Sequence, residues 1–307
     1  MKFPLVSIII PVHNTAFYIR ETLECICNQT LQEIEIIVIN DGSTDNSLEI
    51  IQQQANKDAR IKVYTQDINQ GPSTSRNLGV QQAQGKYIYF MDSDDLLAPE
   101  TLAICYQKCS TENLDFVFFD ANCINTDNKF NGQNYTHEAK PGSQTACGIE
   151  WLNYQLETST FRVPVWLNFI RHDYLKQTKL FFYPGIIHED QLYTFLLYLN
   201  ASQISYIPQA FPQHRLRENS IMARQFSWKN IEGYFTTFQE ITHYKKNKSE
   251  EIQNTIDKYV RVTLNAVIWQ AQELSFKEKF RTLCICTKRG YLKYLKLKNL
   301  AVMLFRH

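Results

Sequence analysis

Short apolar runs alternate with helical patterns along the first third of the chain. Four runs of strand length stand out, over residues 5–11, 34–39, 61–64 and 87–91, and the first of them is nearly continuous in apolarity. Helical patterns lie between them: from Asn14 through Ile26, through Leu48 and Ile51, and over residues 73–83. A nearly continuous apolar run such as the first is typical of a strand that is buried on both faces. The alternation predicts an α/β fold with a mostly parallel central sheet and helices on both of its faces.

The pattern changes twice farther along the chain. After a helix over residues 99–112 and a strand over residues 115–119, residues 122–148 are polar and rich in Asn, Gly and Thr. This composition predicts an excursion or a mobile loop. From about residue 226 the pattern is helical, as over residues 252–273, so we expect a helical C-terminal region.

Composition and charge exclude several classes of protein. An apolar content of 44% indicates a globular chain. With a formal net charge of only +1, the protein has no overall positive charge that would attract nucleic acid. The eight cysteines lack zinc-knuckle spacing, and no apolar run reaches the roughly 20 residues of a membrane span. Residues 1–6 contain no charged-then-apolar leader. We therefore expect a cytoplasmic protein.

Three acidic side chains follow the point where a predicted core strand stops. Asp92, Ser93, Asp94 and Asp95 come directly after residues 87–91. Because ligands collect at the carboxyl ends of strands in such sheets, a cationic partner is expected there. Carboxylate oxygens suit Mg²⁺ or Mn²⁺, and few protein ligands leave positions open for substrate phosphates. The alternative is a solvated turn in which Ser93 or Asp94 caps the next helix.

The same rule brings other turns to this edge of the sheet. Residues 11–14 follow the first strand, and Asp41 and Gly42 follow the second. Asp41 can accept hydrogen bonds from a base or ribose, and Gly42 lets the backbone approach closely. Asn69 precedes a helix whose first turns carry Arg76, which could face a ligand. Taken singly, each of these features is also common as a capped turn or a surface group.

Together these motifs resemble the inverting family 2 glycosyltransferases of GT-A fold. The resemblance rests on four stretches: Pro11-Val12-His13-Asn14, Asp41-Gly42-Ser43-Thr44-Asp45, residues 69–79, and Gly85-Lys86-Tyr87-Ile88 leading to Asp92-Ser93-Asp94-Asp95. It is dense over residues 5–100, looser to about residue 224 and absent beyond. Together with the helical pattern from about residue 226, it predicts these divisions: a GT-A domain over 1–224, with a nucleotide-sugar-binding half over 1–100 and an acceptor half over 101–224, and a helical region over 225–307.

The resemblance also implies a role for each matching residue. The nucleotide-sugar donor would be held by residues from several turns: Pro11, Val12, Asn14, Asp41, Asn69 and Arg76. Asp92 and Asp94 would hold a metal, Mn²⁺ or Mg²⁺, and together with Ser93 would bind the donor. The family often has Tyr where this chain has His13, and Asp where it has Asn40. Both departures lie in the implied nucleotide pocket.

A second acidic element lies farther along the chain. Residues 187–191 precede an apolar helix over 192–199 and resemble the Glu-Asp element of the family. This makes Asp190 the candidate general base, because an acceptor hydroxyl must lose its proton as it attacks the anomeric carbon. His188 is a rival base by pKa. The alternative is that Asp190 only caps the helix, with Glu189 as its structural neighbour.

Residues 213–220 match a further stretch of the family. Arg215 or Arg217 could close over the diphosphate and neutralise its charge as it leaves. His214 could add a third metal ligand. The alternative is an exposed basic turn after Pro212.

The resemblance implies transfer of a sugar from a nucleotide-sugar donor to a hydroxyl of a glycan or lipid-linked acceptor in cell-surface polysaccharide synthesis. The donor would be a UDP-linked hexose or N-acetylhexosamine. Trp166 could face the acceptor sugar, although a core position is expected. From Lys277 onward, nine Lys and Arg stand against one acid, Glu278. This stretch could make a peripheral contact with an anionic bilayer at the inner face of the membrane or pack against a partner helix.

Two other functions share parts of this pattern. A sugar-phosphate nucleotidyltransferase could have a similar fold and acidic site, but Pro11-Val12-His13-Asn14 lacks the glycines expected of that class. A non-catalytic nucleotide-sugar-binding module would keep the pocket without turnover, and the presence of Asp190 argues against it. A processive membrane synthase is disfavoured because the chain lacks apolar spans and a Gln-x-x-Arg-Trp element.

Overall fold

The computed structural model describes residues 3–126, 129–216 and 225–305, except for the side chains of residues 130–133. The chain divides into two compact units. Unit 1 comprises Met1–Gly185 and Tyr193–Arg217, and unit 2 comprises Ile186–Leu192 and Glu218–His307. The boundary that the sequence predicts near residue 224 lies outside the described residues.

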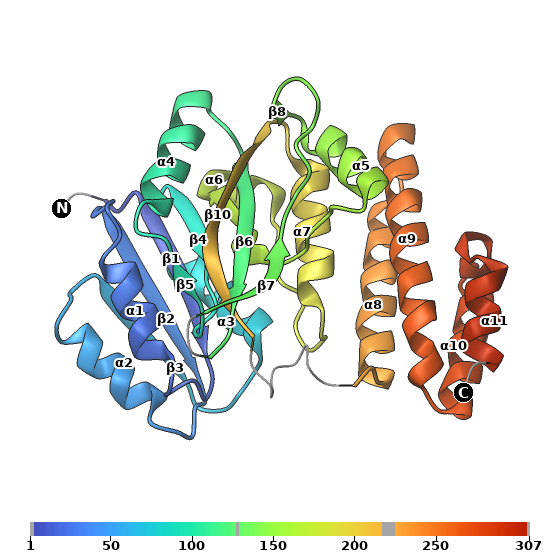
Figure 1. Cartoon of the computed structure of the whole chain (residues 1–307), viewed down its shortest axis with the longest axis horizontal. Coiled ribbons are helices and arrows are strands. Elements are labelled where there is room, and N and C mark those ends of the chain that lie inside the picture. The colour runs from blue at the N-terminus through green and yellow to red at the C-terminus, as the bar shows by residue number, and fades with distance from the viewer. Residues whose placement is uncertain (1–2, 127–128, 217–224, 306–307) are drawn as a thin grey trace. The chain divides into compact units, whose positions relative to one another are not determined.

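Unit 1 begins with the alternating strands and helices that the apolar pattern predicts (Figure 1). In chain order they are β1 (Val6–Val12), α1 (Ile19–Cys27), β2 (Ile34–Asp41), α2 (Ser47–Ala55), β3 (Ile61–Gln66), α3 (Pro72–Gln82) and β4 (Tyr87–Phe90). β1 lies between β2 and β4 and pairs in parallel with both, and β2 pairs in parallel with β3. The carboxyl ends of these strands therefore lie at the same edge of the sheet.

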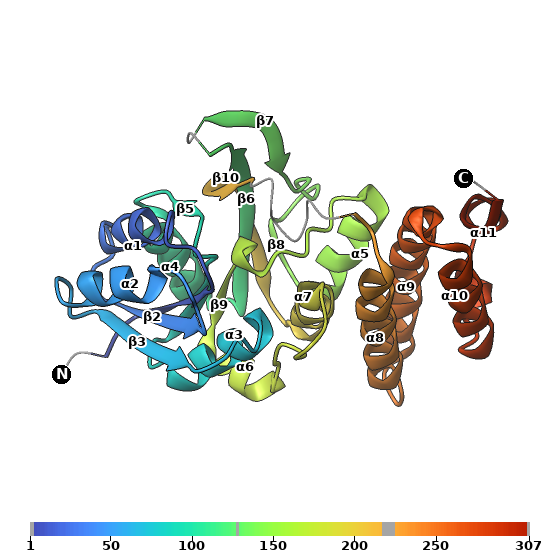
Figure 2. The same ribbon diagram turned by 90° about the horizontal axis from the view of Figure 1, so that it is seen from below.

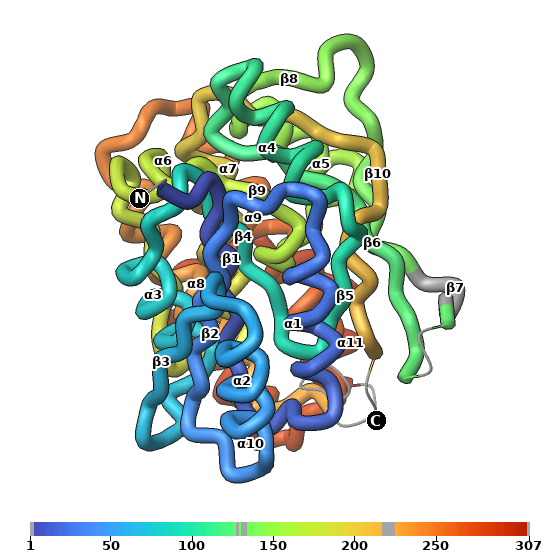
Figure 3. Tube along the Cα trace, turned by 90° about the vertical axis from the view of Figure 1, so that its left-hand side faces the viewer, coloured from blue at the N-terminus to red at the C-terminus, as the bar shows by residue number. Residues whose placement is uncertain are grey.

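The side chains of these strands alternate between two faces. Val6, Ile8 and Ile10 of β1 belong to a buried cluster that also contains residues of α1, α2 and α4 (Thr101–Glu112). Ile9 points to the other face, where a Cβ added to Gly79 of α3 would lie 2.3 Å from the Ile9 side chain. Figure 3 shows α1 and α2 side by side. Helices thus cover both faces of the sheet, as the sequence predicts.

The rest of unit 1 extends this sheet with strands of both directions. Its elements are β5 (Leu96–Leu97), α4, β6 (Phe116–Ile124), β7 (Phe130–Tyr135), β8 (Thr145–Ala146), α5 (Gly148–Thr158), β9 (Asn168–Arg171), α6 (His172–Thr178), α7 (Glu189–Asn200), whose first turn belongs to unit 2, and β10 (Ile204–Arg215). The strand order is β3-β2-β1-β4-β9-β6-β10-β5. β9 is antiparallel to both β4 and β6, whereas β10 is parallel to β6. The sheet is therefore parallel from β3 to β4 and mixed beyond.

The polar stretch over residues 122–148 contains short strands. β6 continues to Ile124, and β7 pairs with it in antiparallel fashion. Figure 2 shows this hairpin in green at one side of the sheet. β8 then pairs with the beginning of β10. The excursion that the composition predicts is thus partly extended structure.

Unit 2 is helical, as the sequence predicts for the C-terminal region. It contains α8 (Trp228–Tyr244), α9 (Glu250–Gln270), α10 (Phe276–Lys288) and α11 (Leu297–Phe305). Ser227 and Ser275 begin α8 and α10 with capping boxes. Phe235 and Phe238 of α8 are buried among the helices. Within the described part of the chain, no helix combines the length and the apolarity that crossing a bilayer requires.

Candidate active site

The turn after β1 is joined to the turn after β2 through Asn14. The backbone of Asn14 has a positive φ of 53°, and α1 begins only at Ile19, not near Asn14 as the sequence predicts. The side-chain oxygen of Asn14 accepts a hydrogen bond from the backbone N–H of Thr44 at 2.8 Å. Pro11 is partly buried, and the side chain of Val12 is fully buried. Val12 therefore offers no exposed atom to a ligand at this turn, whereas Asn14 is exposed.

Asp41 anchors the loop that precedes α3. Its carboxylate is buried and accepts hydrogen bonds from the backbone N–H groups of Gln70 at 2.7 Å and Gly71 at 2.8 Å. Asn69 lies exposed in the same loop. Gly42 has a positive φ of 61°, and a Cβ there would lie 2.6 Å from the backbone of this loop. The predicted role of Gly42 in close backbone approach therefore concerns the chain's own loop.

Arg76 and Asp92 form an ion pair that the sequence motifs do not indicate. Nη2 of Arg76 lies 3.1 Å from Oδ1 of Asp92. The Arg76 side chain is 6% exposed and that of Asp92 is 30% exposed. The guanidinium also lies over the ring of Phe182, 5.2 Å from its centroid. The ion pair and the contact with Phe182 together hold the positive charge of Arg76 beside the Asp92 carboxylate, which solvent can reach.

The backbone of the acidic turn is held at three successive carbonyl groups. The buried hydroxyl of Thr22 on α1 lies 3.1 Å from the oxygen of Ser93 and 3.0 Å from that of Asp95. Nε of Arg215 donates a hydrogen bond to the oxygen of Asp94 at 2.9 Å. Because α1 and β10 both bind the turn, its backbone is fixed relative to the sheet.

Arg215 is buried beneath this turn. Its Nη2 lies 2.9 Å from a carboxylate oxygen of Glu21, and its guanidinium lies 5.0 Å from the ring centroid of Tyr18. The structure thus gives Arg215 a place in the framework of the turn, where it is already engaged by protein groups. Arg217, its predicted alternative, lies outside the described residues.

His214 pairs with Asp95, the innermost acid of the turn. Its Nδ1 lies 2.9 Å from Oδ2 of Asp95, and its ring stacks on Trp166 at 5.1 Å between centroids. Burial alone would lower the pKa of His214, but the carboxylate of Asp95 outweighs it and raises this pKa to about 9. Trp166 is only 4% exposed, so it is a core residue of this cluster.

Asp92 and Asp94 supply the oxygen ligands that a hard divalent cation prefers. Among the residues that the structure describes, no group of three or more His, Cys, Asp and Glu side chains is arranged to bind a metal. The two carboxylates fit a site that completes its coordination with water and substrate phosphates. His214 is not brought together with them as a third ligand, and its charged ring beside Asp95 would have to lose a proton to bind a metal.

Asp190 lies in the first turn of α7, in the part of this helix that belongs to unit 2. Glu189 begins the helix, and His188 precedes it with a positive φ of 64°. Nε2 of His188 is 2.9 Å from the side-chain nitrogen of Asn230, and burial lowers the His188 pKa. His188 is therefore held as a neutral ring with Nε2 occupied, which weakens it as a rival base.

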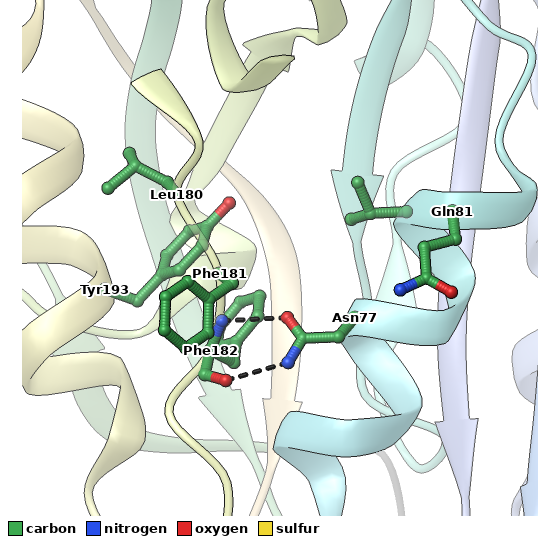
Figure 4. A pocket seen from close by; sticks show the side chains of 7 residues that line it. Asn77, Gln81, Leu180, Phe181, Phe182 and Tyr193 are labelled. Atoms are coloured by element: carbon green, nitrogen blue, oxygen red, sulfur yellow. Dashed lines mark hydrogen bonds between the residues drawn. The ribbon is translucent and has the colours of Figure 1, made fainter. Parts of the chain in front are cut away.

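A pocket of about 350 Å³ lies beside α3 in unit 1. Figure 4 shows Asn77 bonded to both backbone groups of Phe182, each at 2.8 Å. The ring of Phe182 stacks on Tyr193 with centroids 3.8 Å apart. None of the site residues predicted from the sequence lines this pocket. The two hydrogen bonds of Asn77 hold residues 180–182 against α3, and the ring of Phe182 lies beneath the guanidinium of Arg76.

Sequence reasoning did not identify the residues that support the acidic turn from below. Thr22, Glu21 and Tyr18 lie on or next to α1, and Phe182 lies beneath Arg76. Thr22 could have been identified from the sequence, because it is a polar residue on the same buried helix face as Ile19 and Leu23 and therefore needs a hydrogen-bond partner. The contacts of Glu21 and Tyr18 span nearly 200 residues and leave no local pattern.

Comparisons with known proteins agree with this fold. Residues 7–183 match the family model described as Glycosyl transferase family 2. An uncharacterized glycosyltransferase of Haemophilus influenzae is 34% identical over 209 residues, which cover 64% of this chain and 72% of that protein. The structure of S. aureus TarS 1–349 with UDP-GlcNAc has a TM-score of 0.66 and 22% identity, covering 97% of this chain and 90% of that chain. The mannosyltransferase PcManGT of Pyrobaculum calidifontis, with GDP-Man and Mn²⁺, has a TM-score of 0.61 and 15% identity, covering 96% of this chain and 78% of that chain.

The family match covers more than half of the chain, from β1 to the segment that packs beneath Arg76. The two solved structures share the fold over nearly its whole length. The acidic turn lies inside the matched region. This chain therefore belongs to glycosyl transferase family 2 and has the GT-A fold.

Proposed function

We propose that this chain is an inverting glycosyltransferase that uses a nucleoside diphosphate sugar, a UDP-linked hexose or N-acetylhexosamine. The acceptor is a hydroxyl of a glycan or lipid-linked saccharide in cell-surface polysaccharide synthesis. The observation that carries this proposal is the acidic turn, with Asp92 paired to Arg76 and its backbone held from α1 and β10. The bound UDP-GlcNAc of TarS and the bound GDP-Man of PcManGT support this class of donor.

The donor binds along the carboxyl edge of β1, β2 and β4 in this proposal. The exposed part of the turn over Pro11, Val12 and Asn14, together with the loop that Asp41 anchors, contacts the nucleoside in this proposal. Arg76 presents its positive charge to the diphosphate beside Asp92. When bound, Mn²⁺ or Mg²⁺ would be held by Asp92 and Asp94 and would stabilise the charge of the leaving diphosphate.

Asp190 accepts the proton of the acceptor. The acceptor oxygen forms a bond to the anomeric carbon while the bond from that carbon to the diphosphate oxygen breaks. The hydroxyl proton passes to the Asp190 carboxylate, and the nucleoside diphosphate leaves with the bonding electrons. Attack opposite the leaving group in one displacement inverts the anomeric configuration.

A screen of nucleotide sugars tests the donor class. We expect one nucleoside diphosphate sugar with Mn²⁺ to raise the thermal midpoint, because a ligand at 100 times its Kd stabilises the native state by about 2.7 kcal/mol. The same sugar without Mn²⁺ is the control. Turnover should release nucleoside diphosphate. Release of pyrophosphate, or no stabilisation by any nucleotide sugar, would contradict the proposed donor site.

The terminal helices of unit 2 fit an anionic lipid surface, where a lipid-linked acceptor would lie. Phe276 and Phe280 lie one turn apart on α10 and are 79% and 58% exposed. Leu297 and Phe305 lie two turns apart on α11 and are 85% and 78% exposed. Exposed lysines accompany them, such as Lys277 next to Phe276. Exposed apolar side chains among positive charges are typical of helices that lie in a bilayer interface.

Vesicle binding tests this contact. We expect Phe276→Ser with Phe280→Ser to weaken binding to phosphatidylglycerol vesicles at least about tenfold, because burying one phenylalanine side chain contributes about 1.5–3 kcal/mol. Phe3→Ser in unit 1 is a matched control, because Phe3 is also 79% exposed. Sedimentation with vesicles would measure both variants. Equal binding to phosphatidylcholine vesicles, or an equal loss in the control, would exclude this surface as the contact.

A further inference from the structure

The segment Ile186–Leu192, which contains Asp190, belongs to the helical unit and not to unit 1. We propose that α8 and α9 form a frame that positions Asp190 for proton transfer, through Gly233, Asn230, Tyr234 and Tyr259. The inference rests on the proposed role of Asp190 as the general base. It gives unit 2 a part in the reaction that is separate from the proposed lipid contact of its exposed apolar side chains.

The first contact of this frame is a close backbone approach. Gly233 lies in the second turn of α8, and a Cβ added there would lie 2.2 Å from the backbone oxygen of Ile187. Glycine is among the poorest helix formers, so its place inside a helix needs a packing reason. The lack of a side chain at Gly233 allows the backbone of Ile187 to lie directly on α8.

The second contact fixes His188. Its ring stacks on Tyr234 with centroids 4.6 Å apart, and its Nε2 lies 2.9 Å from the side-chain nitrogen of Asn230. The side-chain oxygen of Asn230 accepts the backbone N–H of Ser227 at 2.8 Å, which fixes the orientation of the amide. The amide nitrogen of Asn230 must therefore donate to His188. One side chain thus begins α8 and holds the residue that precedes α7.

The third contact lies on the other side of Asp190. The hydroxyl of Tyr259, on α9, lies 2.8 Å from the side-chain oxygen of Gln191 and 3.2 Å from its backbone oxygen. Tyr259 is 1% exposed, so this hydroxyl is fixed in the interior of unit 2. Gln191 immediately follows Asp190 in the first turn of α7.

These contacts hold Ile187, His188 and Gln191, which flank Asp190 on both sides. A shift of the Asp190 backbone relative to α8 and α9 would strain these contacts. A general base must lie within hydrogen-bond reach of the proton that it removes. A displacement of about 1 Å can lower the rate by about 100-fold. The frame thus acts on turnover through Asp190.

Two substitutions test the frame in the full-length enzyme. We expect Gly233→Ala to lower kcat by about 100-fold and Tyr259→Phe by about tenfold, since both displace the base. The donor KM and the Kd for the nucleoside diphosphate should stay at their wild-type values, because the donor binds to unit 1. Tyr294→Phe is the matched control, because the Tyr294 hydroxyl contacts Asp257 at 2.7 Å within the same unit. Hydrogen exchange of residues 186–192 should rise in the two test variants only.

The outcomes separate this inference from the proposed function. If Asp190→Asn inactivates the enzyme but Gly233→Ala and Tyr259→Phe keep the wild-type kcat, the positioning role is wrong and the base assignment stands. If Asp190→Asn remains fully active, the base assignment fails and the inference fails with it. Should Gly233→Ala not fold, Tyr259→Phe decides alone. A loss of kcat in Tyr294→Phe equal to that in Tyr259→Phe would show a general effect of destabilising unit 2 and would overturn the inference.

Discussion

Asp190→Asn is expected to lower kcat for sugar transfer by about 1,000-fold, because a positioned general base contributes about 100-fold to 10,000-fold. Asparagine has the same shape but cannot accept the hydroxyl proton. The affinity for the donor should not change, since the donor residues lie in unit 1. Initial rates of nucleoside diphosphate release, together with nucleotide titrations, would measure both quantities.

A matched control separates proton transfer from helix stabilisation. Asp173 also lies in the first turn of a helix, α6, where an acid interacts favourably with the helix dipole. Asp173→Asn should therefore have the same small effect on stability and none on kcat. If Asp190→Asn retains more than about a tenth of the wild-type kcat, its carboxylate is not the base, given the contribution that a base makes.

Most of the parallel part of the sheet could be predicted because β1, β2 and β4 are buried on both faces. β2 shows this most clearly, since all of its residues from Ile34 to Asp41 are buried. Apolar runs of this kind are readable without any knowledge of their partners. β9 was missed because it has only four residues, Asn168–Arg171, and its identity as a strand depends on pairing with both β4 and β6.

The sequence predicted which residues belong to the candidate site, but it did not predict which of them contact one another. The sequence indicated that Arg76 and Asp92 belong to one edge of the sheet, and their ion pair joins them there. For Arg215 the family resemblance implied a cation that could close over the diphosphate, with an exposed basic turn as the alternative. It did not indicate that the guanidinium lies buried between the backbone of Asp94 and the carboxylate of Glu21. Such pairings depend on packing over long sequence separations.

The sequence did not predict that residues 186–192 belong to unit 2, and the reason is different. Asp190 is followed by the apolar stretch of α7, so the sequence joins it to the preceding α/β domain. Its immediate neighbours are held by Gly233 and Tyr259, which lie on α8 and α9 and individually resemble ordinary helix residues. Only the short distances between these residues identify the helical unit as their support.

Removal of the Asp94 carboxylate should abolish transfer and the metal dependence of donor binding. We expect Asp94→Ala to lower kcat at least about 1,000-fold, because the charge developing on the leaving diphosphate would lose its preorganised stabilisation. In the wild-type enzyme, Mn²⁺ should increase the stabilisation given by the nucleotide sugar that the thermal screen selects. In Asp94→Ala the stabilisation by that sugar should be equal with and without Mn²⁺.

Glu100→Ala provides the control for this loss. Glu100 is an exposed acid six residues after Asp94, and its side chain makes no capping hydrogen bond to α4. Its removal changes the net charge by the same amount and should leave both kcat and the Mn²⁺ dependence intact. Because the backbone oxygen of Asp94 still accepts from Arg215 in the alanine variant, the turn should keep its shape. A Mn²⁺-dependent gain in Asp94→Ala equal to that of Glu100→Ala would therefore place the metal elsewhere and refute the acidic turn as the donor site.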